Sequence, residues 1–136
     1  MARQLFTARH GGVSQGSYSS LNLGDHVGDD LTAVVANRQR LSSLLSVSQL
    51  QFMNQIHGST IAVIDEVITT PEADALVTNQ KGIALVVMVA DCLPILLDGQ
   101  SVIGAAHVGR KGMTNGVIAN TVSQMQKLGA TQIRLL

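Results

Sequence analysis

The chain has 136 residues, of which 46% are hydrophobic and only 13% are charged, and its nine basic side chains balance its nine acidic ones. This length is typical of one domain with a real core, so we expect residues 1–136 to form a single domain. The balanced charge argues against nucleic-acid binding, which draws on a net basic surface. The high hydrophobic content excludes a disordered chain.

The single cysteine, Cys92, cannot form an internal disulfide, which favours a reducing compartment, most simply the cytosol. The N-terminus lacks the apolar stretch of a signal peptide. The longest apolar run, residues 83–97, is broken by Asp91 and Pro94 and is shorter than the ~20 residues of a membrane-spanning helix. We therefore expect a cytoplasmic protein without a membrane partner.

The first thirty residues predict a short strand over 4–8 and then a long polar loop rich in Gly, Ser and Asn. A long loop inside a domain is usually functional or mobile. For each reactive side chain of this loop, simple solvation is an equally good interpretation. These side chains are Arg9, His10, Asn22 and His26.

Apolar residues at helical spacing predict an amphipathic helix over 31–45, which Asp29 or Asp30 can cap. Asn37 lies on or beside the apolar stripe of this helix, next to Arg38. Because a buried amide must find hydrogen-bond partners, Asn37 either ties down a neighbouring loop or reaches a functional site.

Residues 49–66 predict two strands with His57 in a glycine-flanked turn between them, and 74–78 predicts a further strand. The continuous apolar run 83–90 predicts a strand buried on both faces. Asp98-Gly99 predicts a hairpin whose arms are 93–97 and 101–107. Cys92 lies just before one arm and His107 at the end of the other. We therefore expect Cys92 and His107 at the same end of the sheet.

A second amphipathic helix is predicted over 113–128, ended by Gly129, and a last strand is predicted from residue 132. The segment Gly109–Gly112 precedes this helix and contains Arg110 and Lys111. A glycine-flanked basic pair that opens a helix can hold an anion. A solvated basic turn is the alternative interpretation.

His57, Cys92 and His107 form a donor set typical of catalytic zinc, with a fourth position left for water or substrate. Their spacing matches no zinc-finger pattern, so spacing alone is a weak signal. Cys92 could instead be inert core or a thiol nucleophile with a histidine base, as in a cysteine hydrolase. Asp91 ends an apolar run, where it could orient a histidine ligand, carry a proton or tie backbone amides.

Taken together, several motifs in family order resemble the YfiH family, whose members are also named laccase-domain proteins, multicopper polyphenol oxidases and purine nucleoside phosphorylases. The matching residues are Arg9–Ser14, Ser20–Gly24, Asn37-Arg38, Gln55–Gly58, Ala73–Ala75, Ala90–Pro94 and Ala105–Gly109.

The resemblance implies a zinc site made by His57, Cys92 and His107, with copper as a less favoured metal. It implies phosphorolysis of purine nucleosides (adenosine, inosine, guanosine and methylthioadenosine) to base and sugar 1-phosphate, with adenosine deamination as a second activity. We rank the oxidase function lower, because one cysteine and four histidines cannot build several copper centres.

For the chemistry beyond the metal, the hypothesis assigns phosphate binding to the basic groups of Arg9, Arg38 or Arg110. Asn22, with Asn37, would fix the substrate or the loop, and Asp91 would carry a proton. Together with Cys92, the catalytic candidates are Asp91, Arg9, Asn22 and Arg38.

Two departures from the family pattern affect these expectations. Gly109-Arg110-Lys111-Gly112 stands where the family usually has Gly-Trp-Arg-Gly, so a flat apolar wall is lost. The chain also ends before the family's Gly-Pro-x-Ile-Gly motif, which predicts a truncated form with exposed apolar surface, self-association and, in the extreme, an inactive interaction module. The expected fold is α+β, a central mixed sheet with helices 31–45 and 113–128 packed on it.

Overall fold

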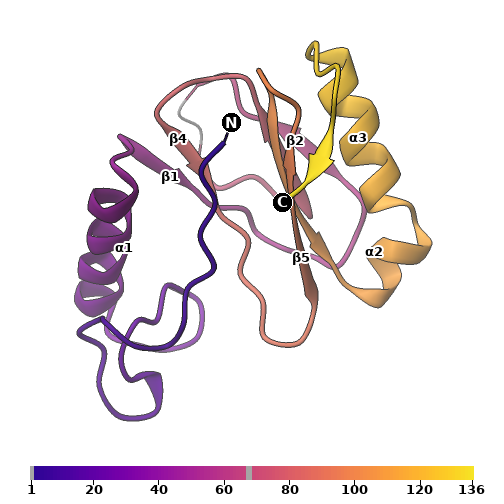
Figure 1. The fold of residues 1–136 in the computed structure, drawn as a ribbon. Helices are drawn as coiled ribbons and strands as arrows, with labels where there is room; N and C mark the ends of the chain where they lie inside the picture. Colours follow the sequence, from indigo (N-terminus) through magenta and orange to yellow (C-terminus); the bar gives the residue numbers. More distant parts are fainter. Residues whose placement is uncertain (1, 67–68) are drawn as a thin grey trace.

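The computed structural model describes residues 2–66 and 69–136. Within these residues the central sheet is mixed and has five strands, and a separate two-stranded sheet packs against it through a second hydrophobic cluster that includes Leu76, Ile83 and Leu85 (Figure 1). The strand order of the larger sheet is β2-β3-β6-β5-β7. Its strands are β2 Ile61–Val63, β3 Ala75–Thr78, β5 Leu93–Asp98, β6 Ile103–Val108 and β7 Arg134–Leu135.

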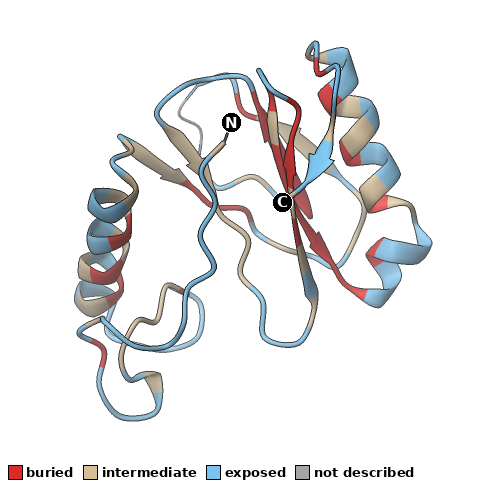
Figure 2. Ribbon diagram, in the orientation of Figure 1, coloured by how far each residue is buried: buried red, intermediate tan, exposed pale blue. Residues whose placement is uncertain are grey.

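The large sheet is mixed because β2 and β3 run parallel, whereas β3–β6, β5–β6 and β5–β7 are antiparallel. Helix α3, Val117–Lys127, packs against β6, β3 and β2. Its buried residues Val117, Thr121 and Met125 recur at helical spacing and face the sheet. The main core lies between α3 and the sheet, as the red ribbon segments in Figure 2 show.

Helix α1, Leu31–Leu45, has the bounds that the sequence predicted, and the Asp30 carboxylate caps it by accepting a hydrogen bond from the Thr32 backbone N–H at 2.8 Å. It lies beside β1, Gln49–Gln51, which pairs in parallel with β4, Ile83–Leu85 (Figure 1). The α+β class with a mixed central sheet is therefore confirmed, but α1 packs beside the small sheet and not on the central one.

Of the predicted strands, 4–8 does not form and 83–90 is much shorter than predicted. Residues 4–8 are exposed and irregular, and only 83–85 of the predicted strand 83–90 pairs with a neighbour. The strand β4 is half-buried, not buried on both faces. A strand persists only where a partner supplies hydrogen bonds, and β1 offers β4 three residues.

The predicted helix 113–128 is divided in two. Helix α2, Arg110–Thr114, ends at Asn115, and Gly116 adopts φ +84° before α3 begins. That angle belongs to the left-handed region, which glycine enters without steric cost. The apolar residues at helical spacing lie in α3, and the backbone at Gly116 separates this helix from α2.

Asn37 is fully buried on α1 and ties the polar loop to this helix. Its side-chain oxygen accepts from the Val13 backbone N–H at 2.8 Å. Its amide nitrogen donates to the Ser14 hydroxyl and to the carbonyls of Ser20 and Asn22, at 2.8–3.1 Å. Of the two interpretations that the sequence left open, the contacts support the structural tie.

Asp98 is a second fully buried polar residue, at the end of β5. Its carboxylate accepts hydrogen bonds from the backbone N–H groups of Gln100 at 3.0 Å and Ala2 at 3.3 Å, and from Arg134 at 3.2 Å. Burial opposes ionisation, but these donors outweigh it and hold the pKa of Asp98 below its usual value. The carboxylate therefore fastens the hairpin turn and the last strand.

Within residues 2–66 and 69–136, no helix is both long enough and apolar enough to cross a lipid bilayer. The exposed apolar surface that the sequence predicted is present, with Phe6 and Leu135 more than half exposed. Self-association through this surface stays a prediction.

Replacement of Asn37 by Ala should destabilise the chain by about 2–4 kcal/mol, because it leaves several loop groups in the interior without partners. Urea unfolding followed by circular dichroism measures this change. Gln39→Ala, on the exposed face of the same helix, is the matched control and should change stability by less than about 0.5 kcal/mol. Equal effects of the two substitutions would contradict the tie.

Candidate metal centre

Three side chains that are far apart in the sequence meet at one end of the large sheet. His57 lies in the turn before β2, Cys92 directly precedes β5, and His107 is on β6. One donor atom from each lies within 4.8 Å of the other two. His107 is buried, Cys92 is half-buried and His57 is exposed, so the cluster is open on one side.

The hairpin explains why Cys92 and His107 meet. Strands β5 and β6 pair antiparallel from Asp98–Ile103 at the turn to Leu93–Val108 at the far end, with Pro94 opposite His107. The residue before Leu93 is Cys92, so its thiol reaches the end of the sheet where His107 stands. The two residues thus lie at the same end of the sheet, as the hairpin predicted.

His57 completes the cluster from a turn with unusual backbone geometry. Its φ of +60° is in the left-handed region, which is uncommon for a residue other than glycine. The rings of His57 and His107 stand edge to face, with centroids 4.8 Å apart and an interplanar angle of 83°. The turn therefore aims the His57 imidazole at the same point as the other two donors.

Asp74, a residue not predicted from the sequence to take part in the site, lies next to His107. It is fully buried, and its Oδ1 is 2.8 Å from His107 Nδ1. The same carboxylate accepts the backbone N–H groups of Ile56, His57 and Gly58. Burial penalises ionisation, yet the bond with His107 and the three amide bonds keep the pKa of Asp74 below its usual value. The signal that could have identified Asp74 is a carboxylate directly before a buried strand, which is costly unless it has partners.

Glycines permit the close packing of the cluster. A Cβ at Gly109 would lie 3.0 Å from His57 Cδ2 and 3.5 Å from the Cys92 sulfur. A Cβ at Gly112 would lie 2.7 Å from the backbone oxygen of Gly58. The sequence indicated an anion site at Gly109–Gly112. In the structure, the glycines of this segment allow the His57 turn to approach the end of β6 closely.

Asp91 is exposed and contacts the cluster at Cys92, whose sulfur is 3.8 Å from Asp91 Oδ1. Burial of the thiol, and then the negative charge of Asp91, raise the pKa of Cys92 above its usual value. The carboxylate that contacts the His107 ring is that of Asp74, at 2.8 Å from Nδ1. The orienting role weighed for Asp91 thus belongs to a different carboxylate.

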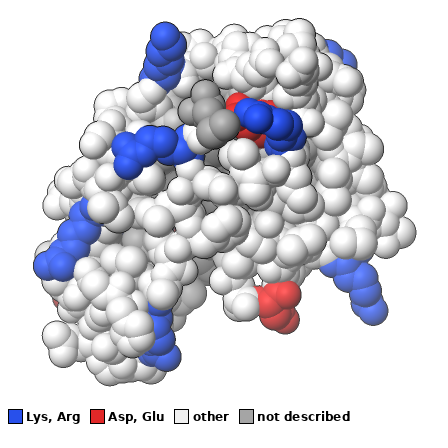
Figure 3. Space-filling view, viewed as in Figure 1, with Lys and Arg blue, Asp and Glu red and all other residues white. Residues whose placement is uncertain are grey.

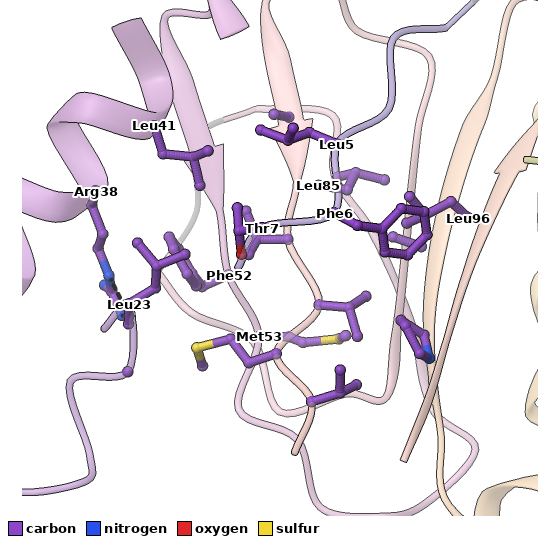
Figure 4. Close-up of a pocket in the computed structure, with 18 of the residues that line it drawn as sticks. Leu5, Phe6, Thr7, Leu23, Arg38, Leu41, Phe52, Met53, Leu85 and Leu96 are labelled. Atoms are coloured by element: carbon purple, nitrogen blue, oxygen red, sulfur yellow. Dashed lines mark hydrogen bonds between the residues drawn. The ribbon is translucent and has the colours of Figure 1, made fainter. Parts of the chain in front are cut away.

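An open cleft of about 1500 Å³ reaches the cluster at His57. Figure 4 shows its mainly apolar lining, with Phe6 and Leu96 on one side and Phe52, Met53 and Arg38 on the other. The N-terminal segment that failed to form a strand supplies Leu5, Phe6 and Thr7 to this lining. The cleft offers apolar surface beside the donor cluster, which is typical of small-molecule sites.

Three other candidates line this cleft but do not join the cluster. Arg9 donates to the carbonyls of Ser17 and Ser19, and Asn22 bonds to Gly24 and Asp29.

Arg38 donates from Nε and Nη2 to the Leu23 carbonyl, pairs with Asp25 at 3.2 Å and stacks over the Phe52 ring at 3.9 Å. These contacts hold the polar loop over the cleft.

Lys and Arg side chains are scattered over the face shown in Figure 3 and form no continuous basic patch there. Arg110 and Lys111 are exposed on α2.

The donor set suits a metal ion that accepts sulfur and imidazole ligands, since Zn²⁺ binds Cys thiolate and His nitrogen in catalytic sites with three protein ligands. A histidine ligand usually donates its second ring N–H to a carboxylate, and Asp74 occupies that position against His107. The residues therefore fit such an ion.

Curated relatives share nearly the whole of this chain. A purine nucleoside phosphorylase of Corynebacterium glutamicum is 50% identical over 141 residues, which covers 98% of this chain and 57% of that protein. A purine nucleoside phosphorylase of Deinococcus radiodurans is 44% identical, with 96% and 52% covered. The chain thus spans about half the length of these curated relatives.

Solved structures show the same fold. YlmD from Geobacillus stearothermophilus superposes with a TM-score of 0.84 at 33% identity, covering 93% of this chain and 53% of that one. A Neisseria meningitidis protein superposes with a TM-score of 0.78 at 41% identity, covering 87% and 50%. The family model described as multi-copper polyphenol oxidoreductase laccase matches residues 3–136. The chain therefore belongs to this laccase-domain family, whose solved structures include the YfiH protein of Bacillus licheniformis.

Proposed function

We propose that the chain forms the metal centre of a zinc-dependent purine nucleoside phosphorylase. The observation that carries the proposal is the convergence of His57, Cys92 and His107 beside an apolar cleft. The names of relatives that are 44–50% identical support the same activity. The substrates would be adenosine, inosine, guanosine or methylthioadenosine with phosphate, and the products would be the free base and a sugar 1-phosphate.

We assign the following roles in binding and catalysis to residues of the chain. His57, Cys92 and His107 would hold the ion, which would act as a Lewis acid beside the cleft. The apolar lining, including Phe6 and Leu96, would pack against the purine face of the substrate.

Arg9 and Arg38 line the same cleft and bring positive charge for phosphate. Asn22 holds the loop that carries them, through its bonds to Gly24 and Asp29. Asp91, which is exposed beside Cys92, would accept or return a proton.

Adenosine deamination is proposed as a side activity of the same centre. The copper oxidase alternative is weaker, because the described residues contain one cluster of three His, Cys or acidic donors, and multicopper chemistry needs several centres. The cysteine hydrolase alternative is also weaker. A reactive thiol requires a lowered pKa, whereas burial and Asp91 raise the pKa of Cys92.

Cytoplasmic localisation and action as a single domain on small molecules, without nucleic-acid or membrane partners, belong to the same proposal. The rival proposal is an inactive interaction module that self-associates through exposed apolar side chains. The experiments below separate the two, because a module would bind no substrate at the metal centre.

The purified 136-residue chain should contain about one zinc per chain by mass spectrometry, since the three donors form one site. Cys92→Ala should lose this zinc, because the thiolate is the only charged ligand of the set. Ser101→Ala, at an exposed turn position, is the control and should keep it. A folded wild-type chain without metal would refute the zinc proposal and favour a thiol enzyme or an inactive module.

Adenosine with phosphate should yield adenine and ribose 1-phosphate, measured by chromatography, and omission of phosphate should abolish this product. Cys92→Ala should reduce the rate at least about 100-fold, as expected when a site loses its metal ligand. Release of inosine would report the deaminase activity, and oxidation of a phenol under air would report the oxidase alternative. A metal-loaded chain that converts no nucleoside would favour the inactive module.

Gly109→Ala should weaken metal binding several-fold while the chain still folds. The added Cβ would lie 3.0 Å from the His57 ring and force the ring away from the donor cluster. Chelator competition measures the affinity. Gly24→Ala is the matched control, because its Cβ would meet neighbours only at an ordinary 3.5 Å. Unchanged affinity in Gly109→Ala would show that the close approach of β6 and the His57 turn is not needed for the site.

A further inference from the structure

We propose that Asp74 is a positioning residue that sets the orientation of two of the three metal ligands, His57 and His107, through one buried carboxylate. The inference deepens the proposed function, because it rests on these histidines being metal ligands. Asp74 lies just before β3, and neither histidine is near it in the sequence.

The two carboxylate oxygens of Asp74 divide their contacts between the two ligand segments. Oδ1 is 2.8 Å from His107 Nδ1 and accepts the His57 backbone N–H at 2.9 Å. Oδ2 accepts the N–H groups of Gly58 at 2.6 Å and Ile56 at 3.3 Å. Bonds from neutral donors to a carboxylate are shorter and stronger than bonds between neutral groups. The Asp74 carboxylate therefore fixes the His57 turn relative to β6 through hydrogen bonds to both.

For His107, the contact decides which ring nitrogen is left for a metal. A carboxylate at Nδ1 stabilises the tautomer that carries its proton there, so Nε2 keeps its lone pair. The backbone reinforces this geometry, because the His107 N–H donates to the Asp74 carbonyl at 2.8 Å. Both the position and the tautomer of His107 thus depend on Asp74.

For His57, the carboxylate supports a backbone that a non-glycine residue rarely adopts. With φ at +60°, three successive N–H groups at residues 56–58 converge on Asp74. Strained backbone persists where surrounding contacts over-determine it. Loss of the carboxylate would release the turn and with it the direction of the His57 ring.

Asp74 differs from Asp98, the other fully buried carboxylate at this sheet, in the charge of its partners. Asp74 has no exposed surface, and its ion pairs among the described residues comprise only the one with His107. A buried carboxylate costs free energy unless hydrogen bonds and nearby positive charge compensate it, and Asp74 has four hydrogen bonds but no Lys or Arg partner among the described residues. Asp98, equally buried, has Arg134 at 3.2 Å. A cation held on the far side of His107 would give Asp74 the compensation that Asp98 receives from arginine.

The test compares Asp74→Asn with Asp98→Asn, since both remove a fully buried carboxylate and Asp98 lies at the opposite end of β5 from Cys92. Binding of Co²⁺ and Zn²⁺ to the 136-residue chain is measured by chelator competition, with the absorption bands of Co²⁺ as a spectroscopic signature. Asp74→Asn should lower affinity about 10- to 100-fold and shift the Co²⁺ bands. Asp98→Asn should leave the affinity within about threefold, whatever it does to the melting temperature.

Unchanged Co²⁺ affinity and spectrum in a folded Asp74→Asn chain would overturn the inference, as would equal losses of affinity in both variants. Nitrogen-15 NMR of the histidine rings in the metal-free wild type gives a second readout. This measurement does not depend on whether the Asp74→Asn variant folds. His107 should show the Nδ1–H tautomer, and an Nε2–H tautomer would overturn the inference. A wild-type chain that takes up no metal would refute the proposed function, while the tautomer would still decide the role of Asp74.

Discussion

The antiparallel pairing of β5 with β6 is the constraint on which the candidate site depends. It places the turn at Asp98 and the two open ends at Leu93 and Val108, so Cys92 and His107 are brought to one edge. Side chains alternate between the two faces of a strand, and a slip of one residue would move His107 to the other face. The pairing of β3 with β6 extends the same register to Asp74, whose carbonyl accepts the His107 N–H.

The electrostatics of this edge favour a cation. The Asp74 carboxylate is buried behind His107, Asp91 lies beside Cys92, and the pKa of the Cys92 thiol is raised. A nucleophilic cysteine requires the opposite environment, with positive charge that stabilises the thiolate. A metal ion would supply that charge to the thiolate and to both carboxylates at once, so the same arrangement that disfavours a free thiolate suits a metal ligand.

The sequence predicts those elements of the fold that depend on local pattern. Helix α1 has its predicted bounds, and the Asp98-Gly99 turn joins β5 to β6. The predictions of secondary structure are wrong where pairing with a distant strand, or the backbone conformation of a single residue, determines the structure. Residues 83–90 are apolar enough for a long strand, but β1 pairs with three of them. The second helix is broken by the left-handed backbone of Gly116, a conformation that apolar periodicity does not encode.

In the site, too, some contacts follow from local sequence pattern and others do not, and those of Asp74 belong to the second kind. The meeting of Cys92 and His107 follows from one hairpin, whereas the place of His57 depends on a turn that a third segment holds. Hydrophobic pattern reports which residues enter the core but not which polar groups meet there. A charged residue next to a buried strand is informative for that reason, because burial without partners is unfavourable. For Asp74 the partners are the two histidine segments, so a carboxylate that would be unfavourable to bury alone joins them.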